Sequence, residues 1–78
     1  MRVPRKCLID LLKKNNCTRL DNSHGKEIWV TASPHNLIIR LPENGAIPLA
    51  LVEIICLEIF NMGIWEFDYF LGESGFTP

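Results

Sequence analysis

The side chains best suited to proton transfer in this sequence are its two histidines, His24 and His35. An imidazole with an unperturbed pKa of about 6.5 can accept or donate a proton at neutral pH. His24 lies in a cluster of turn-forming residues, 22–25, with a cation on either side at Arg19 and Lys26. His35 lies in a Pro-His-Asn turn. We take His24 as the candidate catalytic residue; the alternative for each histidine is a turn position without a chemical role.

Other site chemistries find little support in the sequence. Cys7, Cys17 and Cys56 are an odd number of cysteines at wide spacing without a Cys-x-x-Cys pair, so neither a disulfide framework nor a zinc site is indicated. We expect each to be a small buried apolar group. The sequence has no recognisable carboxylate-pair motif and no Gly-rich loop between a strand and a helix. It therefore predicts no metal site and no cofactor.

The charges are distributed unevenly along the chain, although the net charge is only −1. Residues 1–26 contain seven basic and two acidic residues, whereas residues 27–78 contain one basic and seven acidic residues. This asymmetry favours a basic surface that attracts phosphate, with ordinary solvated charge as the alternative. The candidate residues for contacts to a phosphate-bearing ligand such as a nucleic acid are Lys13, Lys14, Arg19, Lys26, Trp29 and Arg40.

The elements that position these residues follow from the hydrophobic period. Leu8, Leu11 and Leu12 form one stripe and predict a helix over residues 4–15. Period-two alternation between turn-forming clusters predicts a three-stranded antiparallel meander over residues 17–41. Its outer face is expected to display four side chains: Arg19, Trp29, Ile38 and Arg40.

The longest apolar segment predicts a helix over residues 47–62, with Pro48 at its start and Gly63 after its end. Apolar residues occupy nearly every side of this helix, which is more than a core of this size can cover. We therefore expect part of it to lie in a homo- or hetero-oligomeric interface, through Leu51, Ile54, Ile55 and Ile59. Glu53 and Glu58 argue against a membrane span, and no secretory signal is recognised, so a cytoplasmic protein is expected.

A short helix over residues 64–71 and a loose tail over residues 73–78 complete the predicted order. The expected fold is a single α+β domain, an α-β-β-β-α two-layer sandwich with a short C-terminal helix.

This order, together with particular segments, resembles the HicA family of bacterial toxin-antitoxin ribonucleases. The likeness rests on residues 6–16 (KCLIDLLKKNN), on Asn22-Ser23-His24 before a strand containing residues 27–29, and on residues 38–42 leading to residues 47–49 and Met62-Gly63-Ile64, with Phe67 or Phe70 after them. It covers about residues 5–71. The resemblance implies a double-stranded-RNA-binding-like fold and a metal-independent endoribonuclease, in which His24 takes the proton from a ribose 2′-hydroxyl.

The sequence departs from the family's Gly-Ser-His motif in two ways. Asn22 replaces the glycine, and Gly25 and Lys26 stand between His24 and the strand. If the strand fixes the alignment, Lys26 takes the place of the histidine. Two functions therefore stay open: an RNA-directed toxin neutralised by a cognate antitoxin, or a non-catalytic protein-binding module or inhibitor that acts through the apolar helix and the outer sheet face.

Overall fold

The computed structural model describes residues 1–20 and 26–75 and shows a mixed α+β fold. The helix α1 (Arg5–Lys14) is followed by strands β2 (Thr18–Arg19), β3 (Lys26–Val30) and β4 (Ile38–Pro42), which form one antiparallel sheet in the order β2-β3-β4. Then come α2 (Leu49–Glu53), its continuation η1 (Ile54–Ile59) and α3 (Ile64–Glu73). The predicted helix, meander, long helix and short helix are confirmed in this order.

The helix α1 begins after Pro4, and a left-handed residue, Asn16, at φ 62°, follows its C-terminal cap, Asn15. Its buried side chains are Leu8 and Leu12, one turn apart on the predicted stripe. Lys13 and Lys14 occupy its last turn, where cations interact favourably with the helix dipole. The predicted range, residues 4–15, is longer than α1 by one residue at each end.

A second, two-stranded sheet lies at the start of the chain and was not predicted. Strand β1 (Arg2–Val3) pairs antiparallel with β5 (Ile47–Pro48), with Val3 opposite Ile47. Both of these side chains are completely buried. This sheet fixes the first residues of the chain against the segment that leads into α2. Pro48 was predicted to lie in the first turn of the helix. It belongs instead to β5 and is the N-cap of α2, whose first residue is Leu49.

The predicted long helix is not uniform. The backbone changes at Ile54 from α-helix to η1, a π-helix in which hydrogen bonds span five residues. The Phe60 amide then donates to the Ile55 carbonyl at 2.9 Å, and Asn61 adopts φ 56°. The left-handed stop is therefore Asn61, whereas Gly63 caps the start of α3.

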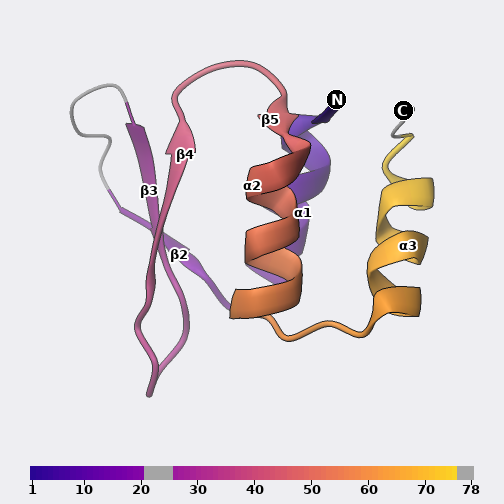
Figure 1. The fold of residues 1–78 in the computed structure, drawn as a ribbon. Coiled ribbons are helices and arrows are strands. Elements are labelled where there is room, and N and C mark those ends of the chain that lie inside the picture. Colours follow the sequence, from indigo (N-terminus) through magenta and orange to yellow (C-terminus); the bar gives the residue numbers. More distant parts are fainter. Residues whose placement is uncertain (21–25, 76–78) are drawn as a thin grey trace.

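The sheet and the helices form successive layers (Figure 1). The pair α1 and α2–η1 covers one face of the β2-β3-β4 sheet, and α3 lies on the side of these helices away from the sheet. One core joins all layers, from Trp29 and Leu41 in the sheet through Leu12 and Val52 to Phe67 of α3. The helix α3 extends to Glu73 and Ser74 is buried, so the prediction of a loose tail over residues 73–78 is wrong for these two residues; residues 76–78 lie outside the described part of the chain.

Candidate nucleic-acid interface

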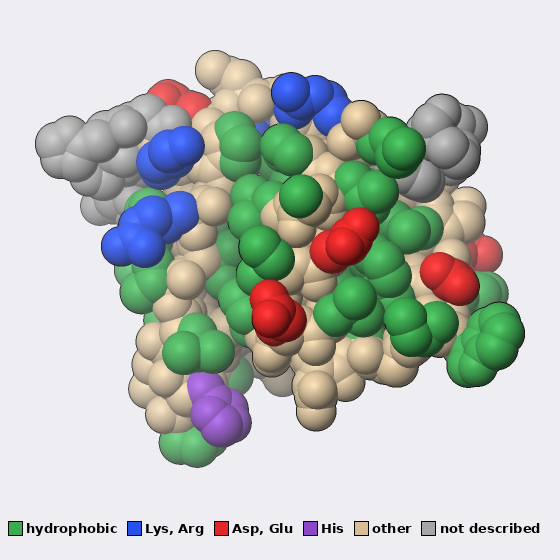
Figure 2. All heavy atoms as spheres, in the orientation of Figure 1, with side chains coloured by type: hydrophobic (Ala, Val, Ile, Leu, Met, Phe, Trp, Pro, Cys, Tyr) green, Lys and Arg blue, Asp and Glu red, His purple; other side chains and the backbone are tan. Residues whose placement is uncertain are grey.

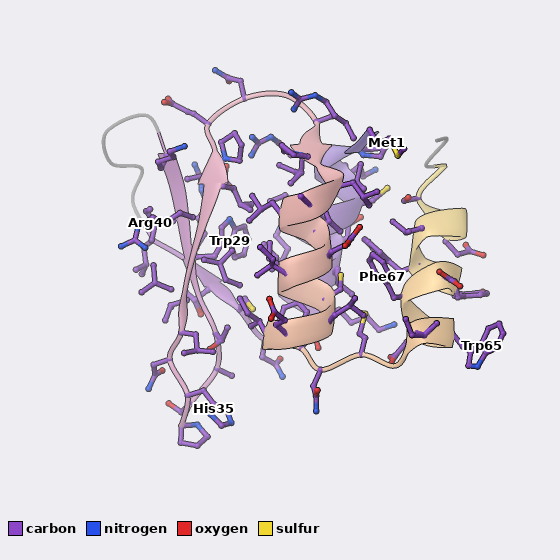
Figure 3. The ribbon with its side chains drawn as sticks, viewed as in Figure 1. Met1, Trp29, His35, Arg40, Trp65 and Phe67 are labelled. Carbon is purple, nitrogen blue, oxygen red and sulfur yellow. The ribbon has the colours of Figure 1, made fainter. Side chains whose placement is uncertain are left out.

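Two of the predicted RNA-binding cations meet on the outer face of the sheet. The register pairs Ile28 with Arg40 and Lys26 with Pro42, so Lys26 and Arg40 are diagonal neighbours on the same face. Both are exposed. Figure 3 shows Arg40 projecting from β4 on the side away from the helices. Both cations are therefore accessible to a phosphate group from the same side of the sheet.

The rest of this outer face is mostly apolar, although the exposed Thr18, opposite Val30, is polar. Ile38, opposite Val30, is 45% exposed, and Leu20, whose amide donates to the Ile28 carbonyl at 2.8 Å, is 43% exposed. Ile28 and Val30 between them are half-buried. No described element covers this face in Figure 1. The outer face therefore combines two cations, one at the start of β3 and one in the middle of β4, with an uncovered apolar surface beside them.

The expectation that Trp29 faces outward is wrong. Trp29 is 2% exposed, pairs with the buried Ile39 and packs in the core between the sheet and the helices (Figure 3). Its cross-strand partner on β2 is Arg19. Arg19 therefore also lies on the inner side of the sheet and not on the expected outer face. Trp29 is thus unavailable for stacking on a base.

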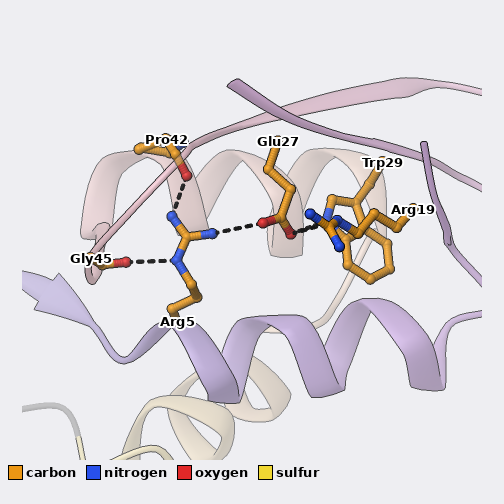
Figure 4. A network of polar contacts seen from close by, with 6 residues as sticks. All are labelled: Arg5, Arg19, Glu27, Trp29, Pro42 and Gly45. Atoms are coloured by element: carbon orange, nitrogen blue, oxygen red, sulfur yellow. Dashed lines mark hydrogen bonds and ion pairs between the residues drawn. The ribbon is translucent and has the colours of Figure 1, made fainter. Parts of the chain in front are cut away.

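A buried carboxylate explains this orientation (Figure 4). Glu27 is 9% exposed; its Oε2 accepts a 2.6 Å hydrogen bond from the Trp29 indole N–H, and its Oε1 accepts one of 3.2 Å from Arg5. Arg19 Nε lies 3.9 Å from Oε2. Because cations compensate the carboxylate, Glu27 and Trp29 can be buried together.

Arg5 also connects α1 to the end of the sheet. Its Nε donates to the Gly45 carbonyl at 2.9 Å, and another of its nitrogens donates to the Pro42 carbonyl. The guanidinium therefore binds the Glu27 carboxylate and two backbone carbonyl groups, and it fixes the segment between β4 and β5 against α1. This network has a structural role, and Arg19 and Trp29 belong to it.

The remaining predicted site residues are dispersed. Lys13 and Lys14 are exposed at the end of α1, in the helical layer, and not on the outer sheet face. His35 lies at the far tip of the β3–β4 hairpin (Figure 3). His24 lies outside the described residues. The structure thus brings together Lys26 and Arg40 among the predicted cations.

The expected interface residues on the long helix also separate. Ile55 is 1% exposed and belongs to the core, so it cannot contribute to a surface contact as predicted. Ile54 is 48% exposed, whereas Leu51 and Ile59 are half-buried against the core. The helix is covered in part by its own chain, because the sheet lies on one side of it and α3 on the other.

The cysteines are free thiols, and two of the three are buried as expected. Burial raises the pKa of the Cys56 thiol to about 11, with a smaller contribution from the Glu66 carboxylate. Burial also raises the pKa of Cys17. Among residues 1–20 and 26–75, no group of three or more His, Cys, Asp and Glu side chains could hold a metal ion.

A cleft between α1, the end of η1 and α3 was missed in the sequence. It has a volume of about 610 Å³ and an apolar floor of Leu11, Phe60, Met62 and Phe70. Three acidic residues, Asp10, Glu66 and Glu73, also line the cleft, together with Tyr69 of α3. The available signal was the pair Trp65 and Tyr69, one helical turn apart among acidic residues.

Comparison of the chain with family models, curated proteins and solved structures gives no match. None of the helices within the described parts of the chain combines the length and hydropathy needed to cross a membrane.

Proposed function

We propose that this chain is a HicA-like, RNA-directed toxin that binds RNA at the end of the outer sheet face and cleaves it with His24 as the general base. The observation that carries this proposal is the position of Lys26 and Arg40. They share one exposed face, and Lys26 comes two residues after His24 in the sequence. The order of one helix, three antiparallel strands and a second helix is also the order that the resemblance implies.

The chemistry requires no metal. A neutral imidazole of His24 removes the proton from a ribose 2′-hydroxyl, and the oxygen attacks the adjacent phosphorus. The bond between phosphorus and the 5′-oxygen of the next nucleotide breaks, this oxygen takes a proton from water, and a 2′,3′-cyclic phosphate forms. His24 then returns its proton to the solvent. Lys26 and Arg40 stabilise the negative charge on the phosphate oxygens. Arg19, the other cation considered from the sequence, is paired with Glu27 on the inner side.

The protein offers a matched pair of histidines for the test. His24→Ala should reduce cleavage of single-stranded RNA by about 10²-fold or more, because one positioned base contributes that much. His35→Ala, the same change at the far tip of the sheet, should leave the rate unchanged. Cleavage that persists in His24→Ala would refute the role of His24. RNA binding without cleavage by the wild-type chain would show that Lys26 has replaced the family's base, since an ammonium group has no lone pair that could accept the proton.

A second function, protein binding, is favoured by the uncovered apolar surface of the outer face. Leu20 and Ile38 lie beside Lys26 and Arg40, so a protein bound there would cover the two cations as well. A cognate antitoxin that binds this face would block RNA directly. If the chain does not cleave RNA, it would itself be a non-catalytic inhibitor or binding module, and it would contact its protein partner through the same face.

A further inference from the structure

The α3 side of the molecule has a chemistry opposite to that of the sheet. Residues 41–78 contain six acidic residues and no lysine or arginine. Figure 2 shows acidic side chains among hydrophobic ones over α2, η1 and α3, whereas cations appear at the sheet and at the upper end. A phosphate-bearing ligand is therefore repelled from this side.

The cleft concentrates this character. Its lining includes three carboxylates, from Asp10, Glu66 and Glu73, and one ammonium group, from Lys14. The floor is apolar, and the volume of about 610 Å³ lies within the range of cavities that hold a ligand or several side chains. An apolar floor with a mainly acidic rim is complementary to an apolar side chain flanked by cations.

Two exposed aromatic residues of α3 lie in or beside the cleft. Tyr69 lines the cleft and is 70% exposed, and Trp65, one turn earlier on the same side of the helix, is 85% exposed. Figure 3 shows Trp65 projecting away from the rest of the molecule. Trp and Tyr are enriched among the residues that dominate binding energy in protein interfaces. We define the α3 surface as the cleft together with Trp65 and Tyr69.

We propose that the α3 surface binds a basic amphipathic helix of a protein partner, whose large apolar side chains enter the cleft and whose lysines or arginines contact Asp10, Glu66 and Glu73. The length of α3, Ile64–Glu73, provides a rigid side for such a helix to pack along. This site lies in the helical layers, apart from the outer sheet face proposed for RNA. Its occupancy is independent of cleavage.

Selection from a library of random 15-residue peptides displayed on phage tests the chemistry of the partner. Peptides that contain tryptophan are set aside, because they would add their own fluorescence. Among the others, the full chain should enrich peptides that place Leu, Phe or Met at helical spacing among Lys and Arg. Binding of a synthesised peptide should shift the fluorescence of the exposed Trp65 to the blue, while the buried Trp29 gives a constant background. Trp65→Phe should remove the shift.

A pair of charge reversals tests the location. Glu73→Lys at the rim should weaken peptide binding about tenfold or more; a cation in the last turn of α3 favours the helix, so the fold is kept. Glu53→Lys, the same change on α2 outside the cleft, should weaken it less than about twofold. Equal effects of the two changes, failure to enrich any peptide, or enrichment of acidic peptides would overturn the proposal. A blue shift that rises with protein concentration alone would also overturn it, since the occupant would then be a second copy of the chain.

Discussion

The Glu27 carboxylate accepts hydrogen bonds from Arg5 of α1 and from the Trp29 indole, and Arg19 of β2 lies near it. We predict that Glu27→Ala lowers the free energy of unfolding by about 2 kcal/mol, because a largely buried indole N–H and two guanidinium groups lose their acceptor. The half-exposed Arg19 contributes little to this loss. Urea denaturation measures the change. Glu43→Ala, at an exposed position between β4 and β5, is the control and should change stability by less than about 0.5 kcal/mol. Equal destabilisation by the two substitutions would contradict a special role for Glu27.

The Cys56 thiol makes stability sensitive to alkaline pH. Its pKa is about 11 in the folded chain and 9.0 as the reference for an exposed thiol. The unfolded chain therefore loses this proton first, so the contribution to stability is complete below pH 9 and is lost as the pH rises towards 11. Cys56→Ala should show a shallower fall in unfolding free energy over this interval.

Iodoacetamide at pH 8 should modify the half-buried Cys7 before Cys17 and Cys56. Rapid alkylation of Cys56 in the folded chain would contradict its burial.

At the scale of elements, the outer sheet face and the long helix offer different association surfaces. Ile38 is 45% exposed beside the half-buried Ile28 and Val30, whereas Ile54, 48% exposed, follows the exposed Glu53. We predict that light scattering detects self-association of the wild-type chain at tens of micromolar and that Ile38→Glu abolishes it, because a charge would interrupt the continuous apolar surface. Ile54→Glu should have little effect. The reverse result would assign association to the helix, as the apolar pattern of the sequence first indicated, and a monomeric wild-type chain would exclude both.

The elements were predictable where a local period determines them. The stripe of Leu8 and Leu12 identified α1, and period-two alternation between turn-forming clusters identified β3 and β4. Which of the two strand faces is inward depends on Arg5, 22 residues away in the chain, and no local pattern contains that partner. The β1–β5 sheet is likewise a pairing between distant dipeptides. The cleft forms only when α3 packs beside α1. The residues of its apolar floor are far apart in the sequence, so no local pattern indicates that they lie together.

At the scale of the whole molecule, the structure separates two pairs of cations that the sequence placed in one surface. Lys26 and Arg40 lie on the outer sheet face, and Lys13 and Lys14 lie at the end of α1, where Lys14 also lines the acidic cleft. We predict that RNA binding uses the first pair. Each neutralised phosphate of a single strand contributes a slope of about −0.7 to the dependence of log K on log salt concentration. Lys26→Ala/Arg40→Ala should therefore reduce the magnitude of this slope by about 1.4 and weaken binding to all RNA sequences alike.

Lys13→Ala/Lys14→Ala is the matched control, since it removes the same charge from the same chain. Fluorescence anisotropy of a labelled single-stranded RNA at several salt concentrations should give this variant the slope of the wild type. If the α1 pair reduces the slope and the sheet pair does not, RNA contacts the helical layer, and the position of His24 beside Lys26 in the sequence loses its significance for cleavage. Equal reductions by both pairs would indicate diffuse attraction to all exposed cations. Absence of binding at low salt would leave the outer face to a protein partner, for which Leu20 and Ile38 would provide the contacts.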